Sequence, residues 1–476
     1  VMTVPQASGA AAAAGGAGSS VPVVVSRAMA AMAAPVMRRE VFMPRASRGT
    51  LSPACRALSA GGSGCQRRAR DPRHRRAMNT SALPSTTATA ITTTIPEKML
   101  ETFRGRASAL DRANAYFESD LADLRSIGYL AAAVPSELGG WGLDLTQLAA
   151  SQRRLARYAP ATALAMTMHS YWVGMAQQLR RWGDDSLHWI IEAALAGEVI
   201  AAGHAEAGND MPVLLSTATA TRVAGGYLVS GRKQFGSNGP AWRWLGAHAM
   251  DATAEGGPRI VHAFIDRTSP GVRVVENWDT LGMRPTQSHD TVLEDVFVPD
   301  ARIGRVVPAG DGSDPFLVAM TMWPLPLMSA VYLGIADRAL ELAVAGATRK
   351  SSIAIPRGGY AYNPFVQHQI AEMYLTLESA SATLERFVTD WVHDEPHGGG
   401  WLPKVYAQKW ICVEAAKRVV DIALDVAGGG ALFTGNELER LYRDVRAGGF
   451  HPGNDALTHE IVGKAVLGVL HEQPRW

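Results

Sequence analysis

The sequence predicts an α+β fold: an N-terminal helical domain, a small central antiparallel β domain and a C-terminal four-helix bundle. Two patterns predict this order. Apolar residues recur at helical spacing before about residue 200 and again after Pro299, and β-branched residues alternate with polar ones between those two regions. With 476 residues, of which 47% are hydrophobic, the chain can bury more than one core. We therefore expect a leader at 1–94 and domains at 95–200, 201–305 and 306–476.

The leader is predicted to be disordered or to come from a mis-assigned start. Residues 1–77 contain twelve arginines, no lysine and only two acidic residues, Glu40 and Asp71, and they show no sustained apolar periodicity. Such a segment fits either a mitochondrial transit peptide or translated sequence upstream of a true start at Met78. The second interpretation, which we favour, predicts a bacterial cytoplasmic protein, and the first predicts a mitochondrial one.

The composition argues against two classes of partner. The residues after position 77 carry 34 basic and 42 acidic side chains, which gives no basic surface for nucleic acid. The three cysteines, Cys55, Cys65 and Cys412, provide neither a disulfide framework nor a Cys-x-x-Cys metal site. We therefore expect no nucleic-acid partner and no metal.

Secondary structure is expected to change twice along the chain. In the first domain, helices are predicted through 121–127 and 145–155, on either side of a Gly-rich turn. In the central domain, strands are predicted at 217–223, 227–231, 259–266, 272–276 and 291–298, the first two joined at Gly225-Gly226. In the last domain, long helices are predicted at about 314–347, 365–393, 401–427 and 455–470.

One apolar stretch has two possible interpretations. Residues 316–336 carry no charge and are numerous enough to cross a membrane as a helix. Pro324 and Pro326 lie in the middle of the stretch, and charged helices surround it. We therefore interpret it as a buried helix of the bundle and expect no membrane contact.

Short motifs occur in a fixed order from Glu97 to the C-terminus, and together they resemble the acyl-CoA dehydrogenase superfamily. The motifs are Gly139-Gly140-Trp141-Gly142-Leu143, Glu206-Ala207-Gly208-Asn209-Asp210, Gly231-Arg232-Lys233-Gln234-Phe235-Gly236-Ser237-Asn238, Leu281-Gly282-Met283-Arg284, Asp425-Val426-Ala427-Gly428-Gly429 and Arg440-Leu441-Tyr442-Arg443-Asp444. Any one of them is weak alone, but the series extends over most of the chain. The resemblance implies the fold of that family.

The resemblance also implies a flavin, because reduced flavin needs hydrogen-bond donors and an aromatic or apolar wall. By the match, Phe235 is the aromatic wall and Ser237 is the hydroxyl beside the reacting edge of the ring. The backbone of Ala202 and Gly203 is expected at the pyrimidine edge, and Asn209 near the pyrophosphate.

In that family a neighbouring subunit holds the adenosine half of FAD. Arg349, Ser351, Gly428 and Gly429 occupy the corresponding positions here. Arginine suits bidentate contact with pyrophosphate, and glycine allows close backbone approach. We therefore expect FAD and a homotetramer, or FMN if the protein is a monooxygenase.

The residue that removes a substrate proton in that family is missing. The family places a carboxylate either at the position of Pro452 or on the central helix, where Trp323 to Leu325 lie here. The nearest candidates in the tail are His451 and Asp455. A histidine can take up or give a proton near pH 7.

Three functions remain open. The first is an FAD-dependent oxidoreductase acting on the CH–CH bond of an acyl thioester with a non-standard base and an electron-acceptor protein. The second is a reduced-flavin-dependent monooxygenase that uses His451 and Ser237, acts on an apolar substrate and needs a partner flavin reductase. The third is a non-catalytic homologue. His169, on an apolar helix, is a further catalytic candidate, although a core role is the simpler interpretation.

Overall fold

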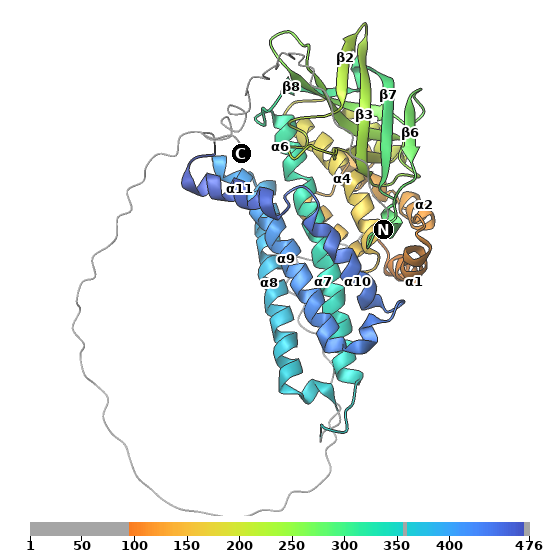
Figure 1. Ribbon diagram of the computed structural model, residues 1–476, viewed down its shortest axis with the longest axis vertical. Helices are drawn as coiled ribbons and strands as arrows, with labels where there is room; N and C mark the ends of the chain where they lie inside the picture. Colours follow the sequence, from red (N-terminus) through yellow and green to blue (C-terminus); the bar gives the residue numbers. More distant parts are fainter. Residues whose placement is uncertain (1–94, 356–358, 471–476) are drawn as a thin grey trace, which may run out of the picture. The chain divides into compact units, whose positions relative to one another are not determined.

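The computed structural model describes residues 95–355 and 359–470, so the predicted leader lies outside the described residues. The described chain begins with helices joined by short 3-10 turns (Figure 1). They are α1 (Glu97–Ala113), α2 (Glu118–Ser126), η2 (Tyr129–Ala131), η3 (Ser136–Leu138), α3 (Leu145–Ala156), α4 (Pro160–Arg181) and α5 (His188–Leu195). The Gly-rich turn ends at Asp144, which starts α3 because its side chain and that of Gln147 form a capping box.

The central domain is a mostly antiparallel sheet, as predicted. Its strands are β1 (Ile200–Gly203), β2 (Thr219–Val223), β3 (Gly226–Gly236), β4 (Trp244–Asp251), β5 (Arg259–Asp266), β6 (Val272–Val275), β7 (His289–Pro299) and β8 (Ile303–Pro308). The order is β6-β7-β3-β2-β4-β5-β8, and β1 pairs with β4 in parallel. The connections contain the 3-10 turns η4 (Arg284–Thr286) and η5 (Asp300–Arg302). The parallel pairing of β1 was not predicted.

The last domain is helical. It contains α6 (Pro315–Met322), α7 (Pro324–Arg349), α8 (Pro364–Val392), α9 (Trp401–Ala427), α10 (Glu437–Arg446) and α11 (Asp455–Leu467), with 3-10 turns η6 (Tyr360–Tyr362), η7 (Gly398–Gly400), η8 (Gly429–Leu432) and η9 (Ala447–Gly449). Figure 1 shows α7, α8 and α9 side by side as long rods, with α10 along them and α11 across one end. The apolar stretch falls in α6 and α7. By length and composition it could cross a membrane, but 83% of its most apolar window is buried, in agreement with the core interpretation.

Helix α4 joins the sheet to the bundle. On one side, the Trp172 indole Nε1 donates to the Ala201 carbonyl of β1 at 3.2 Å. On the other side, Gly174 packs so closely on Trp323, between α6 and α7, that an added Cβ would lie 2.1 Å from that ring. Because α4 touches both layers, the side chains next to these contacts lie between the sheet and the bundle.

Candidate functional site

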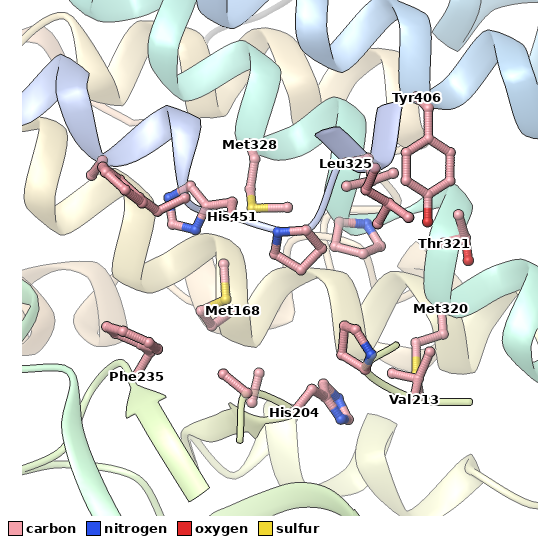
Figure 2. A pocket seen from close by; sticks show the side chains of 18 of the residues that line it. Met168, His204, Val213, Phe235, Met320, Thr321, Leu325, Met328, Tyr406 and His451 are labelled. Atoms are coloured by element: carbon pink, nitrogen blue, oxygen red, sulfur yellow. The ribbon is translucent and has the colours of Figure 1, made fainter. Parts of the chain in front are cut away.

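A cavity of about 610 Å³ lies between the sheet, α4, α6, α7 and the segment that joins α10 to α11. Most of its lining is apolar. Figure 2 labels ten lining residues: Met168, His204, Val213, Phe235, Met320, Thr321, Leu325, Met328, Tyr406 and His451. A cavity of this volume, with few polar groups, is typical of small-molecule sites.

Phe235 is a large apolar group of the cavity wall that stays exposed. It lies where the pairing of β3 with β7 is irregular, and its φ of 56° is in the left-handed region. The ring is 59% exposed and meets Trp278 edge to face at 6.0 Å. A left-handed phenylalanine is strained, and such strain gathers at functional sites. The bulge therefore turns an aromatic face into the cavity.

A chain of hydroxyl groups lies next to this ring. Ser237 Oγ is 2.8 Å from Ser288 Oγ, which is 2.7 Å from Thr286 Oγ1. Thr286 Oγ1 donates to the Met283 carbonyl at 2.8 Å. All three hydroxyl residues line the cavity. Because Thr286 anchors one end, the other hydroxyls can orient toward a bound polar edge.

His451 enters the cavity from the tail, and Figure 2 shows it on the opposite wall from Phe235. Its Nε2 lies 2.6 Å from the hydroxyl of Tyr332, which is fully buried on α7. Burial, helped by the positive charge of Lys409, lowers the pKa of His451 to about 3. The ring is therefore neutral near pH 7, whereas the sequence pointed to an ionisation near neutrality.

Two other predicted catalytic residues lie outside the cavity lining. His169 is buried on α4, where Nε2 donates to the Leu130 carbonyl at 2.8 Å and Nδ1 accepts from the Ile200 amide at 3.2 Å. Both ring nitrogens are therefore used to tie α4 to β1 and η2. Asp455 begins α11 and accepts from the Trp410 indole at 2.8 Å, with a side chain that is 75% exposed.

The predicted flavin-binding loop after β1 is only partly in the cavity. Ala202 lines the cavity, whereas a Cβ at Gly203 would meet Leu245. The Asn209 amide donates to Glu206 at 2.8 Å and to the Leu215 carbonyl at 2.7 Å. Asn209 thus holds the loop in shape in this structure.

Arg349, Ser351, Gly428 and Gly429 lie where α7 and α9 end, far along the bundle from the sheet (Figure 1). Lys350, next to Arg349, donates to the last carbonyl of α9, so the two helix ends are in contact. None of the four lines the cavity. Their role at the flavin of a neighbouring subunit stays a prediction.

Three histidines form a cluster at the cavity wall: His204 lines the cavity, and His248 and His262 are buried behind it. His248 Nε2 donates to the Leu215 carbonyl at 2.9 Å, so its bare Nδ1 accepts from His204 Nδ1 at 3.3 Å. His262 stacks on His248 at 6.0 Å, and neither of its ring nitrogens has a hydrogen-bond partner among the described residues. Burial lowers the pKa of His204 to about 3 and the pKa values of His248 and His262 well below their ordinary value.

A buried ion pair fixes the loop beside this cluster. Glu206 and Lys233 are almost fully buried and in direct contact. Burial alone would raise the pKa of Glu206, but Lys233, the Ser216 hydroxyl and the Thr217 amide outweigh it and lower the pKa to about 2. Glu206 therefore stays ionised and anchors the loop to β3.

Replacing Lys233 with methionine should lower the free energy of unfolding by about 3–5 kcal/mol, because Glu206 would keep a buried charge without its counterion. Denaturant unfolding measures the change. The double variant Glu206→Gln/Lys233→Met should recover much of the loss. The matched control is Arg222→Met, which breaks an ion pair with Asp300 whose side chains are 51% and 52% exposed. A loss in the control as large as in Lys233→Met would contradict this prediction.

Sequence patterns missed Tyr332 and Lys409. Tyr332 lies in the uncharged stretch of α7, where its hydroxyl is the unusual feature. Lys409 lies on the buried face of α9, and its Nζ donates to the carbonyls of Gly448 at 2.8 Å and Gly453 at 3.0 Å. A lone lysine on an apolar helix face could have indicated this contact in the sequence, because a buried lysine needs a hydrogen-bond or charge partner.

Comparison with known proteins gives consistent matches along the chain. Models of the N-terminal, middle and C-terminal domains of acyl-CoA dehydrogenases match residues 86–188, 200–296 and 325–467. These matches confirm the resemblance and the three-part fold predicted from the sequence.

The similar proteins differ in activity. YdbM of Bacillus subtilis, provisionally named an acyl-CoA dehydrogenase, is 30% identical over 77% of this chain and 94% of its own length. L-evernosamine nitrososynthase of a Micromonospora species is 30% identical over 72% of this chain and 82% of its own length. The structure of KijD3 in complex with FMN and a dTDP-amino-keto sugar has a TM-score of 0.71 and 27% identity, covering 80% of this chain and 93% of KijD3.

Proposed function

This chain belongs to the acyl-CoA dehydrogenase family and is a flavin-dependent oxidoreductase, and we propose that it works as a flavin-dependent monooxygenase. In this proposal His451 donates a hydrogen bond to the reacting oxygen. The substrate is a small apolar molecule, and a partner flavin reductase supplies the reduced flavin.

The residues of the cavity fit a flavin. Phe235 offers an uncovered aromatic face, and Ser237, Ser288 and Thr286 offer hydroxyl groups beside it. A bound reduced flavin would supply the electrons that activate molecular oxygen. The apolar walls would exclude water from the reacting groups, which strengthens each hydrogen bond made there.

The observation that carries the proposal is the chemistry of the wall around His451. Pro452 and the stretch at Pro324 and Leu325, where this family keeps its proton-accepting carboxylate, line the cavity and carry no acid. His451 is a polar group that projects from this wall (Figure 2). A neutral histidine suits stabilisation of charge on oxygen better than removal of a weakly acidic carbon-bound proton.

The charges along the lining support a neutral substrate. Arg443 contacts Asp111 and Glu439, Arg446 contacts Asp421, and Lys464 contacts Glu460 at 2.7 Å. Each of these lining cations is already paired. The remaining lining is dominated by methionine, leucine and aromatic side chains, which favour an apolar substrate.

A second candidate is dehydrogenation of an acyl thioester. Two observations favour it: the 30% identity with YdbM over 94% of that protein, and the carboxylate of Glu460 in the cavity lining. Glu460 is paired with Lys464 at 2.7 Å, so it would have to leave this partner to reach a substrate proton. In this alternative Glu460, rather than His451, takes the proton.

Two measurements separate these candidates without knowledge of the substrate. Reduced FMN or FAD, prepared anaerobically, is mixed with the protein and oxygen, and hydrogen peroxide release is followed. A monooxygenase should bind reduced flavin and slow peroxide release relative to free flavin. Anaerobic addition of butyryl-CoA or isovaleryl-CoA to the flavin-loaded protein should leave its absorption unchanged, and bleaching would refute the proposal in favour of dehydrogenation.

We also propose that the protein is a homotetramer in which Arg349, Gly428 and Gly429 reach the flavin of a neighbouring subunit. Two exposed apolar side chains at this end of the bundle, Leu432 and Phe433, each 75% exposed, support an interface there. Arg349→Glu should weaken flavin retention by repelling the phosphate, as ultrafiltration of the flavin-loaded protein would show. A monomer by light scattering that still retains one flavin per chain would refute this assembly.

A further inference from the structure

The hydroxyl of Tyr332 decides which nitrogen of His451 carries the hydrogen. Tyr332 lies in the N-terminal half of α7 with its side chain fully buried, and its hydroxyl is 2.6 Å from His451 Nε2. Among the described residues His451 is the hydrogen-bond partner of this hydroxyl. A buried O–H group needs an acceptor, so the Tyr332 hydroxyl donates and Nε2 accepts.

The other ring nitrogen then faces the cavity as a donor. A neutral imidazole carries one hydrogen, and with Nε2 as acceptor that hydrogen is on Nδ1. His451 lines the cavity, and its Nδ1 has no hydrogen-bond partner among the described residues. Nδ1–H is thus available to a bound molecule.

Lys409 holds the segment that carries His451. Its Nζ is buried and donates to the carbonyls of Gly448 and Gly453, one on each side of the histidine. Gly453, at φ 75°, approaches Tyr406 and the Lys409 stem so closely that a Cβ would lie 3.3 Å and 3.5 Å from them. The same positive charge opposes a second proton on the His451 ring.

We propose that Tyr332 and Lys409 are positioning residues that hold His451 as the Nδ1–H tautomer and aim this N–H into the cavity. His451 is then a hydrogen-bond donor and presents no lone pair to the substrate. This inference rests on the proposed function, because a donor serves charge developing on oxygen whereas a dehydrogenase needs a base. Tyr332 keeps its own proton, since burial raises the pKa of its hydroxyl well above the ordinary value.

The tautomer can be measured without any activity. Protein labelled with ¹⁵N only in histidine is examined by solid-state NMR, with and without bound flavin, and His451→Gln identifies the signals by their loss. The native protein should show His451 protonated at Nδ1. In Tyr332→Phe the Nδ1–H signal should weaken and an Nε2–H signal should appear, because nothing then donates to Nε2. A native His451 protonated at Nε2 would overturn the inference.

Turnover gives the second readout. Tyr332→Phe should lower kcat by about tenfold and change KM less than twofold, since one hydrogen bond that orients the donor is lost. Tyr129→Phe is the matched control: Tyr129 is equally buried but lies on η2, where its hydroxyl is 3.4 Å from Ser151. Unchanged kcat and tautomer in Tyr332→Phe, with native folding, would refute a positioning role.

Lys409→Met tests whether Lys409 holds the segment that carries His451. It should lower kcat and speed hydrogen exchange of the backbone amides from 449 to 454, because the two carbonyls lose their shared donor. If the amides from 449 to 454 exchange as slowly in this variant as in the native protein, and kcat is unchanged, Lys409 does not hold this segment. The proposed function can fail without this inference failing. Bleaching of the flavin by an acyl-CoA would refute the monooxygenase, whereas the tautomer of His451 is measured independently by NMR.

Discussion

Replacing His451 with alanine should reduce turnover by about a hundredfold to a thousandfold, which is the usual effect of removing one donor that stabilises charge on a reacting oxygen. Flavin binding should change little, because Tyr332 and Lys409 contact the ring and the segment rather than the flavin wall at Phe235. The melting temperature should fall by a few degrees, because the buried Tyr332 hydroxyl loses its acceptor. Turnover is measured as product formed per reduced flavin, and peroxide release in the variant should rise as product falls.

The pH profile makes this prediction more specific. The pKa of His451 is lowered to about 3, so the native enzyme should show no ionisation of this residue between pH 5 and 8. His451→Gln, which keeps a donor in the side chain, should retain more turnover than His451→Ala. The matched control is Asp455→Ala, four residues later on the exposed start of α11. A large loss in that control together with native turnover in His451→Ala would contradict the assignment.

The order of the three domains could be predicted because periodicity reports which side chains a helix or strand buries. The expected helices at 365–393 and 401–427 lie within a residue or two of α8 and α9. Strand β4 was not predicted: Trp244–Asp251 is buried along nearly its whole length and therefore shows no clear alternation. Strand β1, the parallel partner of β4, was also not predicted, because it is short and mostly buried and so shows no alternation.

The candidate site was predictable where a motif placed a residue on a known element. Phe235, Ser237 and His451 share one cavity, as the resemblance implied. The contact between Tyr332 and His451 joins residues 119 positions apart, and local patterns carry no information about such a pair. Asp455 was expected near the cavity with His451, but the chain turns at Gly453, with φ 75°, and α11 directs Asp455 outward.

Acid should unfold this protein steeply, because the fold holds several histidines in the neutral form. The pKa of His169 is lowered to about 4 and that of His204 to about 3, and burial also lowers the pKa values of His248 and His262. In the unfolded chain each histidine would titrate near 6.5. Below that pH the unfolded state therefore binds protons that the folded state does not bind, which lowers the free energy of unfolding. Stability is therefore complete above about pH 6.5 and is lost as the pH falls toward 4 and 3.

Two carboxylates oppose this trend, because burial raises the pKa values of both Asp120 and Asp444. Burial raises the pKa of Asp444 to about 6, so the folded state takes up one proton that an unfolded aspartate does not. The histidines with lowered pKa values, His451 included, outnumber these two aspartates, so the free energy of unfolding falls steeply as the pH drops below about 6. Domains are usually stable by about 5–15 kcal/mol, so the midpoint of acid unfolding should lie near pH 5. Glu206, with a pKa of about 2, adds to the loss only below its unfolded value near 4.5.

His262→Phe should reduce this slope and also stabilise the protein at pH 7. Neither ring nitrogen of His262 has a hydrogen-bond partner among the described residues, and its ring packs on Phe316 at 5.1 Å, so phenylalanine fills the space without leaving a polar group unpaired. Denaturant unfolding at pH 7.5, 6.5 and 5.5 should show the stability advantage of the variant over the native protein growing as the pH falls below 6.5. His368→Gln, an exposed position on α8, should leave the slope as it is. If the free energy of unfolding depends on pH equally in the native protein and in His262→Phe, this histidine takes up its proton in the folded state. The acid transition would then have another origin.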